Sequence, residues 1–173
     1  LTSGDNNVAL GSSSMLNATT ASSNVSIGMQ SMGSGVATGS ENVGIGKDSL
    51  YDITSASGVT AIGAESANNI TSGSESVAIG KQALYTATTV GANTAVGYQA
   101  LKLNAVASNT AVGHSAGLNT TGTLNTYVGA SAGVGASGAE ANNVGVGANS
   151  LAAVTTGSNN TATGYNSLDA GTD

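Results

Sequence analysis

The chain has 173 residues, a formal net charge of −6 and only 7% charged residues. Three lysines and no arginine against nine acidic residues exclude general nucleic-acid binding by phosphate neutralisation. The 26 glycines follow no Gly-X-Y period, which excludes collagen. No apolar run is long enough to span a bilayer, so we expect no membrane insertion.

A nine-residue motif recurs along the whole chain, and its clearest copy is Ser76–Leu84. Successive copies are 16 to 18 residues apart. The central glycine of the ten copies is Gly11, Gly28, Gly46, Gly63, Gly80, Gly97, Gly113, Gly129, Gly147 or Gly164. Such a regular period is typical of a solenoid. We predict an all-β fold, a parallel β-solenoid of ten coils of about 17 residues, forming one domain over residues 1–173.

Two β-branched or aliphatic columns precede the glycine. Three positions before it stand Val8, Val25, Val43, Thr60, Val77, Thr94, Thr110, Thr126, Val144 and Thr161. One position before it stand Leu10, Ile27, Ile45, Ile62, Ile79, Val96, Val112, Val128, Val146 and Thr163. Residues two apart share one face of a strand, and β-branched residues fit a pleated surface. We therefore expect a short strand in each copy, with both columns pointing into a core.

Between these columns lies a third one, made almost entirely of Ala, Gly and Ser. We expect this column to face outward, and its persistent small size indicates that another backbone comes close. We therefore predict a homotrimer whose interface contains Ala9, Ala61, Ala78, Ala95, Ala111, Tyr127 and Ala162. A solvated face whose small residues merely reflect repeat duplication is the alternative.

Two further columns flank the strand, one at the bend before it and one beyond the glycine. Eight copies carry Asn directly before the strand, where stacked amides can hydrogen-bond along the solenoid. Four positions after the glycine, seven copies carry an expected core residue from the opposite wall: Met15, Met32, Leu50, Leu84, Leu101, Leu151 and Leu168. The irregular spacer 134–142 predicts a bulged loop.

The segments Ser76–Gly80 and Asn93–Gly97 resemble the head repeat of trimeric autotransporter adhesins (the YadA-like head) and the related repeats of phage tail-fibre shafts. The resemblance covers all ten copies. It implies a left-handed parallel β-roll, three chains around one axis and a role in surface adhesion. The adhesin repeat is shorter, which favours a fibre shaft. We expect a structural segment of an extracellular trimeric fibre for host attachment, first a phage tail fibre and second a bacterial surface adhesin.

Candidate chemistry is sparse. A tailspike-like glycan depolymerase would need paired carboxylates, and Asp48 and Glu65 occupy equivalent places in neighbouring copies. The chain has no arginine and no aromatic platform to hold a substrate, so we expect solvated charges and no enzyme. His114 is the only histidine, which leaves no triad and no metal site within one chain, and we expect no cofactor.

Two surface functions stay open. Thr94, Thr110 and Thr126 form a column of the kind that binds ice, but we expect that column inside because valines share it. The position after the glycine varies, as an exposed corner should, and there Lys81, Tyr98 and His114 are consecutive. They should stack about 4.8 Å apart. If the segment contacts a surface glycan or receptor, we predict that this strip is the point of contact; the alternative is three unrelated exposed side chains on an inert shaft.

Overall fold

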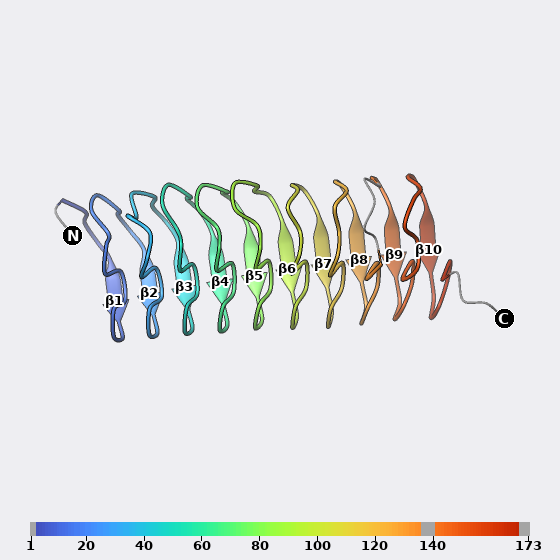
Figure 1. Ribbon diagram of the computed structural model, residues 1–173, viewed down its shortest axis with the longest axis horizontal. Coiled ribbons are helices and arrows are strands. Elements are labelled where there is room, and N and C mark those ends of the chain that lie inside the picture. The colour runs from blue at the N-terminus through green and yellow to red at the C-terminus, as the bar shows by residue number, and fades with distance from the viewer. Residues whose placement is uncertain (1–2, 136–140, 170–173) are drawn as a thin grey trace.

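The computed structural model describes residues 3–135 and 141–169 (Figure 1). It contains ten strands of three residues: β1 Val8–Leu10, β2 Val25–Ile27, β3 Val43–Ile45, β4 Thr60–Ile62, β5 Val77–Ile79, β6 Thr94–Val96, β7 Thr110–Val112, β8 Thr126–Val128, β9 Val144–Val146 and β10 Thr161–Thr163. All are parallel neighbours in one sheet that follows the chain order. The predicted all-β parallel solenoid is confirmed, with about nine complete turns from β1 to β10.

The columns read from the sequence are columns in space. Each strand pairs residue for residue with the next, so that Val77 lies beside Thr94 and Ile79 beside Val96. The ladder extends past the strands, because the N–H of Gly97 donates to the carbonyl of Ile79 at 2.7 Å. The 16- to 18-residue spacing therefore places equivalent positions of successive copies next to each other. The spacer 134–142 falls largely outside the described residues, so its predicted loop is not described.

The predicted orientation of the strands is wrong. From β2 to β10 the central residue of each strand is buried and the flanking residues are partly exposed. In β5, Ala78 is fully buried, whereas Ile79 is 37% exposed. The predicted interface residues Ala61, Ala78, Ala95, Ala111, Tyr127 and Ala162 thus lie inside the coil of their own chain. Ala9, in the same column, is exposed because no described coil precedes β1.

The central residues are small because the same chain folds back beneath them. Beyond the strand glycine, which is the glycine directly after each strand, the chain turns under the sheet. A Cβ on Gly44 would lie 2.8 Å from the Oγ of Ser31 and 3.2 Å from the Cε of Met32. In the preceding coil, the Oγ of Ser26 donates to the carbonyl of Ser31 at 2.9 Å. The backbone that approaches this column is therefore the chain's own return segment and not a partner.

The returning segment supplies the large core side chains. Six of the seven predicted residues are buried, namely Met15, Met32, Leu50, Leu84, Leu101 and Leu151. Leu168 is 55% exposed, because no described coil packs beyond it. These positions have left-handed backbone, with φ near 52° at Leu84, which costs about 1–2 kcal/mol for a residue with a Cβ. Full burial of a leucine side chain contributes about 1.5–3 kcal/mol and offsets that strain.

Tyr127 is the one large residue in the inner column, the column of central strand residues, and two glycines make room for it. At the position where seven coils carry Leu or Met, the coil before Tyr127 carries Gly117 and the coil of Tyr127 itself carries Gly133. A Cβ on Gly133 would lie 2.4 Å from the Tyr127 ring, and one on Gly117 would lie 3.0 Å from it. The ring therefore fills the space that a leucine fills elsewhere. The interior is filled from the strand side in this coil and from the return segment in the others.

Tyr127→Ala should lower the free energy of unfolding by about 3–5 kcal/mol, because it empties a space that no neighbour can fill. The double variant Tyr127→Ala with Gly133→Leu should recover part of this loss, since Leu is tolerated at the equivalent left-handed positions. Urea denaturation followed by circular dichroism measures both. Tyr165→Ala, at a tyrosine that is 74% exposed, is the control and should change little. Equal losses in the single and double variants would contradict the volume exchange.

The predicted asparagine ladder along the solenoid is confirmed, and the structure places it in the interior beside the strands. The Oδ1 of Asn109 accepts the N–H of Asn125 at 2.9 Å, and the Nδ2 of Asn109 donates to the carbonyl of Gly122 at 2.9 Å. Asn109 thus joins its own coil across the interior and the following coil along the axis, as do Asn7, Asn24, Asn42, Asn93 and Asn143. Val59 and Ser76 replace asparagine in two coils; the Oγ of Ser76 still accepts the N–H of Asn93, at 3.2 Å.

Asn109→Ala should destabilise the fold by about 2–4 kcal/mol, because it leaves the buried Asn125 N–H and Gly122 carbonyl without their partner. Asn166→Ala removes an amide from an exposed ladder, where the Oδ1 of Asn166 accepts from Asn149 at 3.1 Å, and should cost far less. Thermal unfolding of the two variants provides the comparison. Equal shifts in midpoint would show that the interior ladder adds nothing beyond a surface one.

Candidate functional site

The first candidate is the outer face of the sheet, formed by the first and third residues of every strand. Because successive residues of a strand point to opposite sides, burying the central residue turns both neighbours outward. Five of the third residues share one environment and are 37% to 38% exposed: Ile62, Ile79, Val112, Val128 and Val146. The strands lie side by side along the long axis of the molecule (Figure 1). The outer face is therefore a regular array repeating at the strand spacing of about 4.8 Å.

No strand residue carries a charge, so this face is uncharged from β1 to β10 and consists of aliphatic side chains and six threonines. Its third residues are Ile from β2 to β5 and Val from β6 to β9, so it becomes less bulky along the chain. Thr94, Thr110 and Thr126 occupy consecutive first positions and lie on this outer side, which overturns the expectation that they are inside. Large contiguous apolar patches on a monomer mark interaction sites. Such a face can bind a flat apolar partner.

The sequence contains a signal for this orientation of the strands. A column of Ala, Gly and Ser beside a column of Leu and Met is the volume pattern of a thin interior, in which large residues from one wall meet small ones from the other. Two columns of Val, Ile and Thr cannot fit the same interior. The side-chain volumes of the facing columns therefore predict that the Ala, Gly and Ser column is buried and that the Val, Ile and Thr columns face outward.

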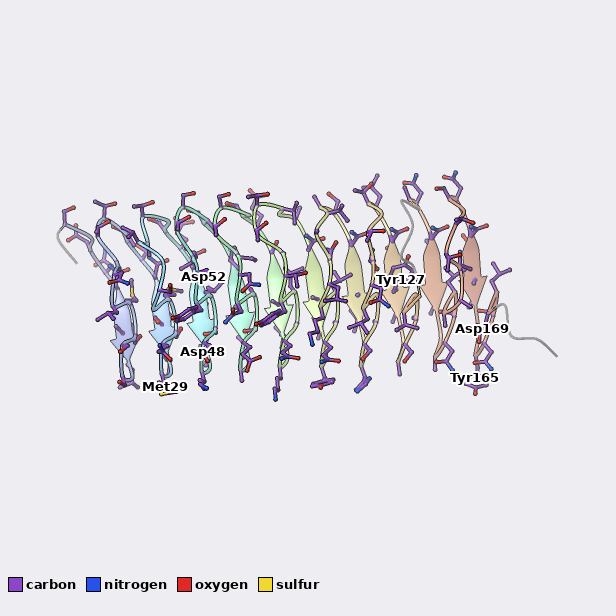
Figure 2. All side chains as sticks on the ribbon, in the orientation of Figure 1. Met29, Asp48, Asp52, Tyr127, Tyr165 and Asp169 are labelled. Atoms are coloured by element: carbon purple, nitrogen blue, oxygen red, sulfur yellow. The ribbon has the colours of Figure 1, made fainter. Side chains whose placement is uncertain are left out.

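The second candidate is the corner strip, defined as Lys81, Tyr98 and His114, each directly after a strand glycine. The N–H of Gln99 donates to the carbonyl of Lys81 at 3.0 Å, and the N–H of Ser115 donates to that of Tyr98 at 2.8 Å. The three residues therefore occupy consecutive rungs of one ladder. Figure 2 shows Met29 and Tyr165, of the same column, along one long edge of the solenoid.

Two members of the strip are in contact. The rings of Tyr98 and His114 stack with their centroids 5.1 Å apart and their planes inclined by 30°. Tyr98 is 42% exposed, and both Lys81 and His114 are exposed. The Nζ of Lys81, the hydroxyl of Tyr98 and the ring nitrogens of His114 form no hydrogen bond or ion pair with residues 3–135 and 141–169. The strip therefore presents three polar groups and a ring stack to solvent.

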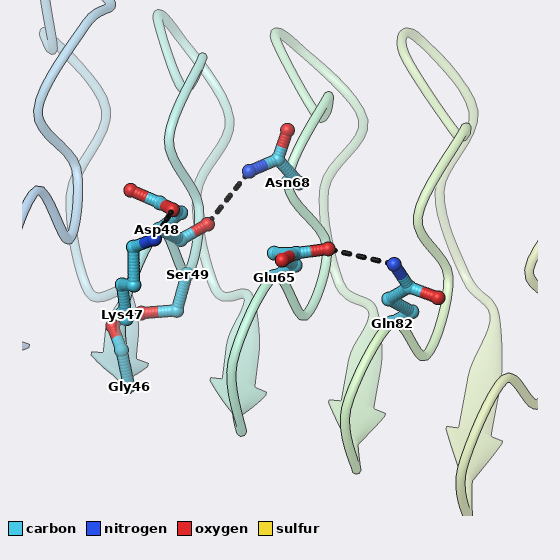
Figure 3. Close-up of polar contacts among 7 residues, drawn as sticks. All are labelled: Gly46, Lys47, Asp48, Ser49, Glu65, Asn68 and Gln82. Atoms are coloured by element: carbon cyan, nitrogen blue, oxygen red, sulfur yellow. Dashed lines mark hydrogen bonds and ion pairs between the residues drawn. The ribbon is translucent and has the colours of Figure 1, made fainter.

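The carboxylates of Asp48 and Glu65 have separate partners (Figure 3). The Nζ of Lys47 lies 3.4 Å from an Oδ of Asp48. An Oε of Glu65 accepts a 2.7 Å hydrogen bond from the Nε2 of Gln82, whose own Oε1 accepts from Gln99 at 2.9 Å. Within the described residues, no group of three His, Cys, Asp or Glu side chains could hold a metal ion. The acids act here as surface hydrogen-bond acceptors and an ion-pair partner.

No protein-family model matches the chain, and no curated protein or solved structure matched it either. Within the described ranges, no helix has the length and apolar character to cross a membrane. The two candidate surfaces therefore carry the functional argument.

Proposed function

We propose that the chain is a structural shaft segment of an extracellular fibre used for host attachment, in which three copies pack their outer faces around a common axis. The observation that carries the proposal is the uncharged outer face, which spans all ten strands. Packing this face against a partner buries Val, Ile and Thr side chains along the full length of the solenoid. Each Å² of apolar area buried contributes about 25 cal/mol to the free energy of association.

A second copy of the chain is the occupant that fits this face best. The outer face repeats at the strand spacing, and a partner must match that period over ten strands to fill it. Another copy has that period by construction. Each chain also presents two columns, one from the first and one from the third strand residues, so that it can contact a different neighbour with each column. Two contacts per chain are what a closed threefold arrangement requires.

The resemblance to adhesin head and tail-fibre repeats supports the remaining parts of the proposal. It favours a left-handed winding, a location on a virion tail fibre first and on a bacterial cell surface second, and a mechanical role for the segment. The solenoid suits that role, because parallel strands in sequence order make a rod that can be lengthened by adding coils.

The purified chain should behave as a homotrimer of three times 16.4 kDa, about 49 kDa, in light scattering. Ile79→Lys should shift it toward the monomer, because it places a charge in a desolvated contact. Lys81→Glu, two residues away on the exposed corner, is the matched control and should remain trimeric. Ala78→Lys, inside the coil, should instead unfold the protein, which circular dichroism distinguishes from dissociation.

A folded 16.4 kDa monomer at micromolar concentration would contradict the trimer. So would an Ile79→Lys variant that keeps the mass of the wild type.

Ice binding is a second candidate function for the same face. The observation that favours it is the outward position of Thr94, Thr110 and Thr126, whose methyl and hydroxyl groups repeat at a fixed spacing on a flat sheet. The aliphatic third residues and the valines of β1, β2 and β3 favour protein contact over water, which places this candidate second.

The two candidates predict opposite states of the face. A trimer hides it and should show no thermal hysteresis, whereas an ice-binding protein exposes it as a monomer. Nanolitre osmometry of the wild type and of Thr110→Lys separates them. Thermal hysteresis that the substitution abolishes, together with a monomeric mass, would replace the fibre proposal by ice binding.

A further inference from the structure

We propose that the corner strip of Lys81, Tyr98 and His114 is a binding site for an acidic polysaccharide, one whose sugar rings carry carboxylate groups. The site lies on the edge of the solenoid and not on the outer sheet face, so it adds a recognition function that the shaft proposal does not require.

The charge distribution points to an anionic ligand. The chain as a whole carries −6, yet no acidic residue occurs between Glu75 and Glu140. That stretch contains two of the three lysines, Lys81 and Lys102, and the single histidine. The middle coils are therefore a basic island in an acidic protein. The electrostatic field of the protein attracts an anion to these coils and repels it elsewhere along the rod.

No described carboxylate forms an ion pair with Lys81. Glu65 lies one coil before Lys81, in the neighbouring column, and its Oε2 accepts a 2.7 Å hydrogen bond from Gln82. Lys47 provides the internal comparison, because it stands in the same column but pairs with Asp48 at 3.4 Å. Lys81 has no such partner among the described residues. Its ammonium group is free to pair with a ligand carboxylate.

The stacked rings point to a sugar ring. The Tyr98 and His114 rings lie 5.1 Å apart and continue each other along the axis. The next residue of the column is Ala130. The N–H of Ser131, which follows it, donates to the carbonyl of His114 at 2.8 Å, so Ala130 continues the ladder beside His114. A methyl group covers little of an imidazole, and His114 is exposed. The apolar C–H face of a pyranose can pack on such a ring, as apolar groups do on aromatic faces.

A column of amides supplies hydrogen bonds beside the rings. The Nε2 of Gln99 donates to the Oε1 of Gln82 at 2.9 Å, which fixes the orientation of both side chains. The Oε1 of Gln99 then has no partner among the described residues and can accept from a sugar hydroxyl. Cation, rings and amides lie in adjacent coils, so a polysaccharide running parallel to the solenoid axis meets them in turn.

A nucleic acid fits these observations less well. Two lysines, one histidine and one tyrosine on a chain of net charge −6 are too few for a ligand with a phosphate at every nucleotide. A polysaccharide offers more widely dispersed charge and a ring for stacking in each unit. The tests below include single-stranded DNA as a competing ligand.

Affinity electrophoresis or calorimetry of the full chain with polygalacturonate tests the proposal, with neutral dextran as the control polymer. The wild type should bind polygalacturonate, more weakly at higher salt, and should ignore dextran. Lys81→Ala and Tyr98→Ala should each weaken binding about tenfold, whereas the matched Lys47→Ala should leave it within about twofold. Circular dichroism and light scattering confirm that the variants keep their fold and mass.

Equal losses for Lys81→Ala and Lys47→Ala would overturn the site, since they would show a response to net charge alone. Absence of polygalacturonate binding by the folded wild type would overturn it as well. So would tighter binding of single-stranded DNA than of polygalacturonate. All strip residues belong to one chain, so a monomeric protein that binds polygalacturonate refutes the trimer and leaves the site standing.

Discussion

The contact between successive strand glycines is the constraint on which the rest of the structure depends. Each of these glycines has φ between 122° and 142°, a region that residues with a Cβ rarely adopt. From Gly11 to Gly147, an added Cβ would lie 2.4–2.7 Å from the backbone of the next strand glycine. The coils can therefore stack at the spacing of a parallel sheet only because each of them turns at a glycine, which keeps every other column in register.

That register makes the interior thin, and the thin interior decides which residues face water. The inner column accommodates only small residues, apart from Tyr127, because the return segment lies directly beneath it. At Gly44, an added Cβ would lie 2.8 Å from the Oγ of Ser31. Leu84 and its equivalents fill the remaining volume. The bulkier β-branched residues have no room inside and form the outer face. Tyr127 follows the same rule, because its ring is admitted only where Gly133 replaces the leucine.

The period predicted the fold because it depends on spacing alone. The ten strands, their parallel order, the asparagine ladder and the consecutive placement of Lys81, Tyr98 and His114 all follow from register, and the structure confirms them. Which face of each strand is buried does not follow from register, since a period of two defines two faces without showing which of them is inside. The preference of Val and Ile for cores misled the prediction, and the volume of the facing Leu84 column was the missing information.

The same constraint separates assembly from recognition on the surface. The first and third strand residues are Val, Ile, Leu or Thr in every coil, and in the proposed assembly a charge among them would enter a contact that every coil repeats. The corner residue packs against little, and the column accommodates side chains as different as Met29, Lys81 and Tyr165. A ligand site can therefore arise at a corner without disturbing the ladder or the sheet. This argues that the proposed polysaccharide site and the proposed assembly face belong to independent parts of one rigid repeat.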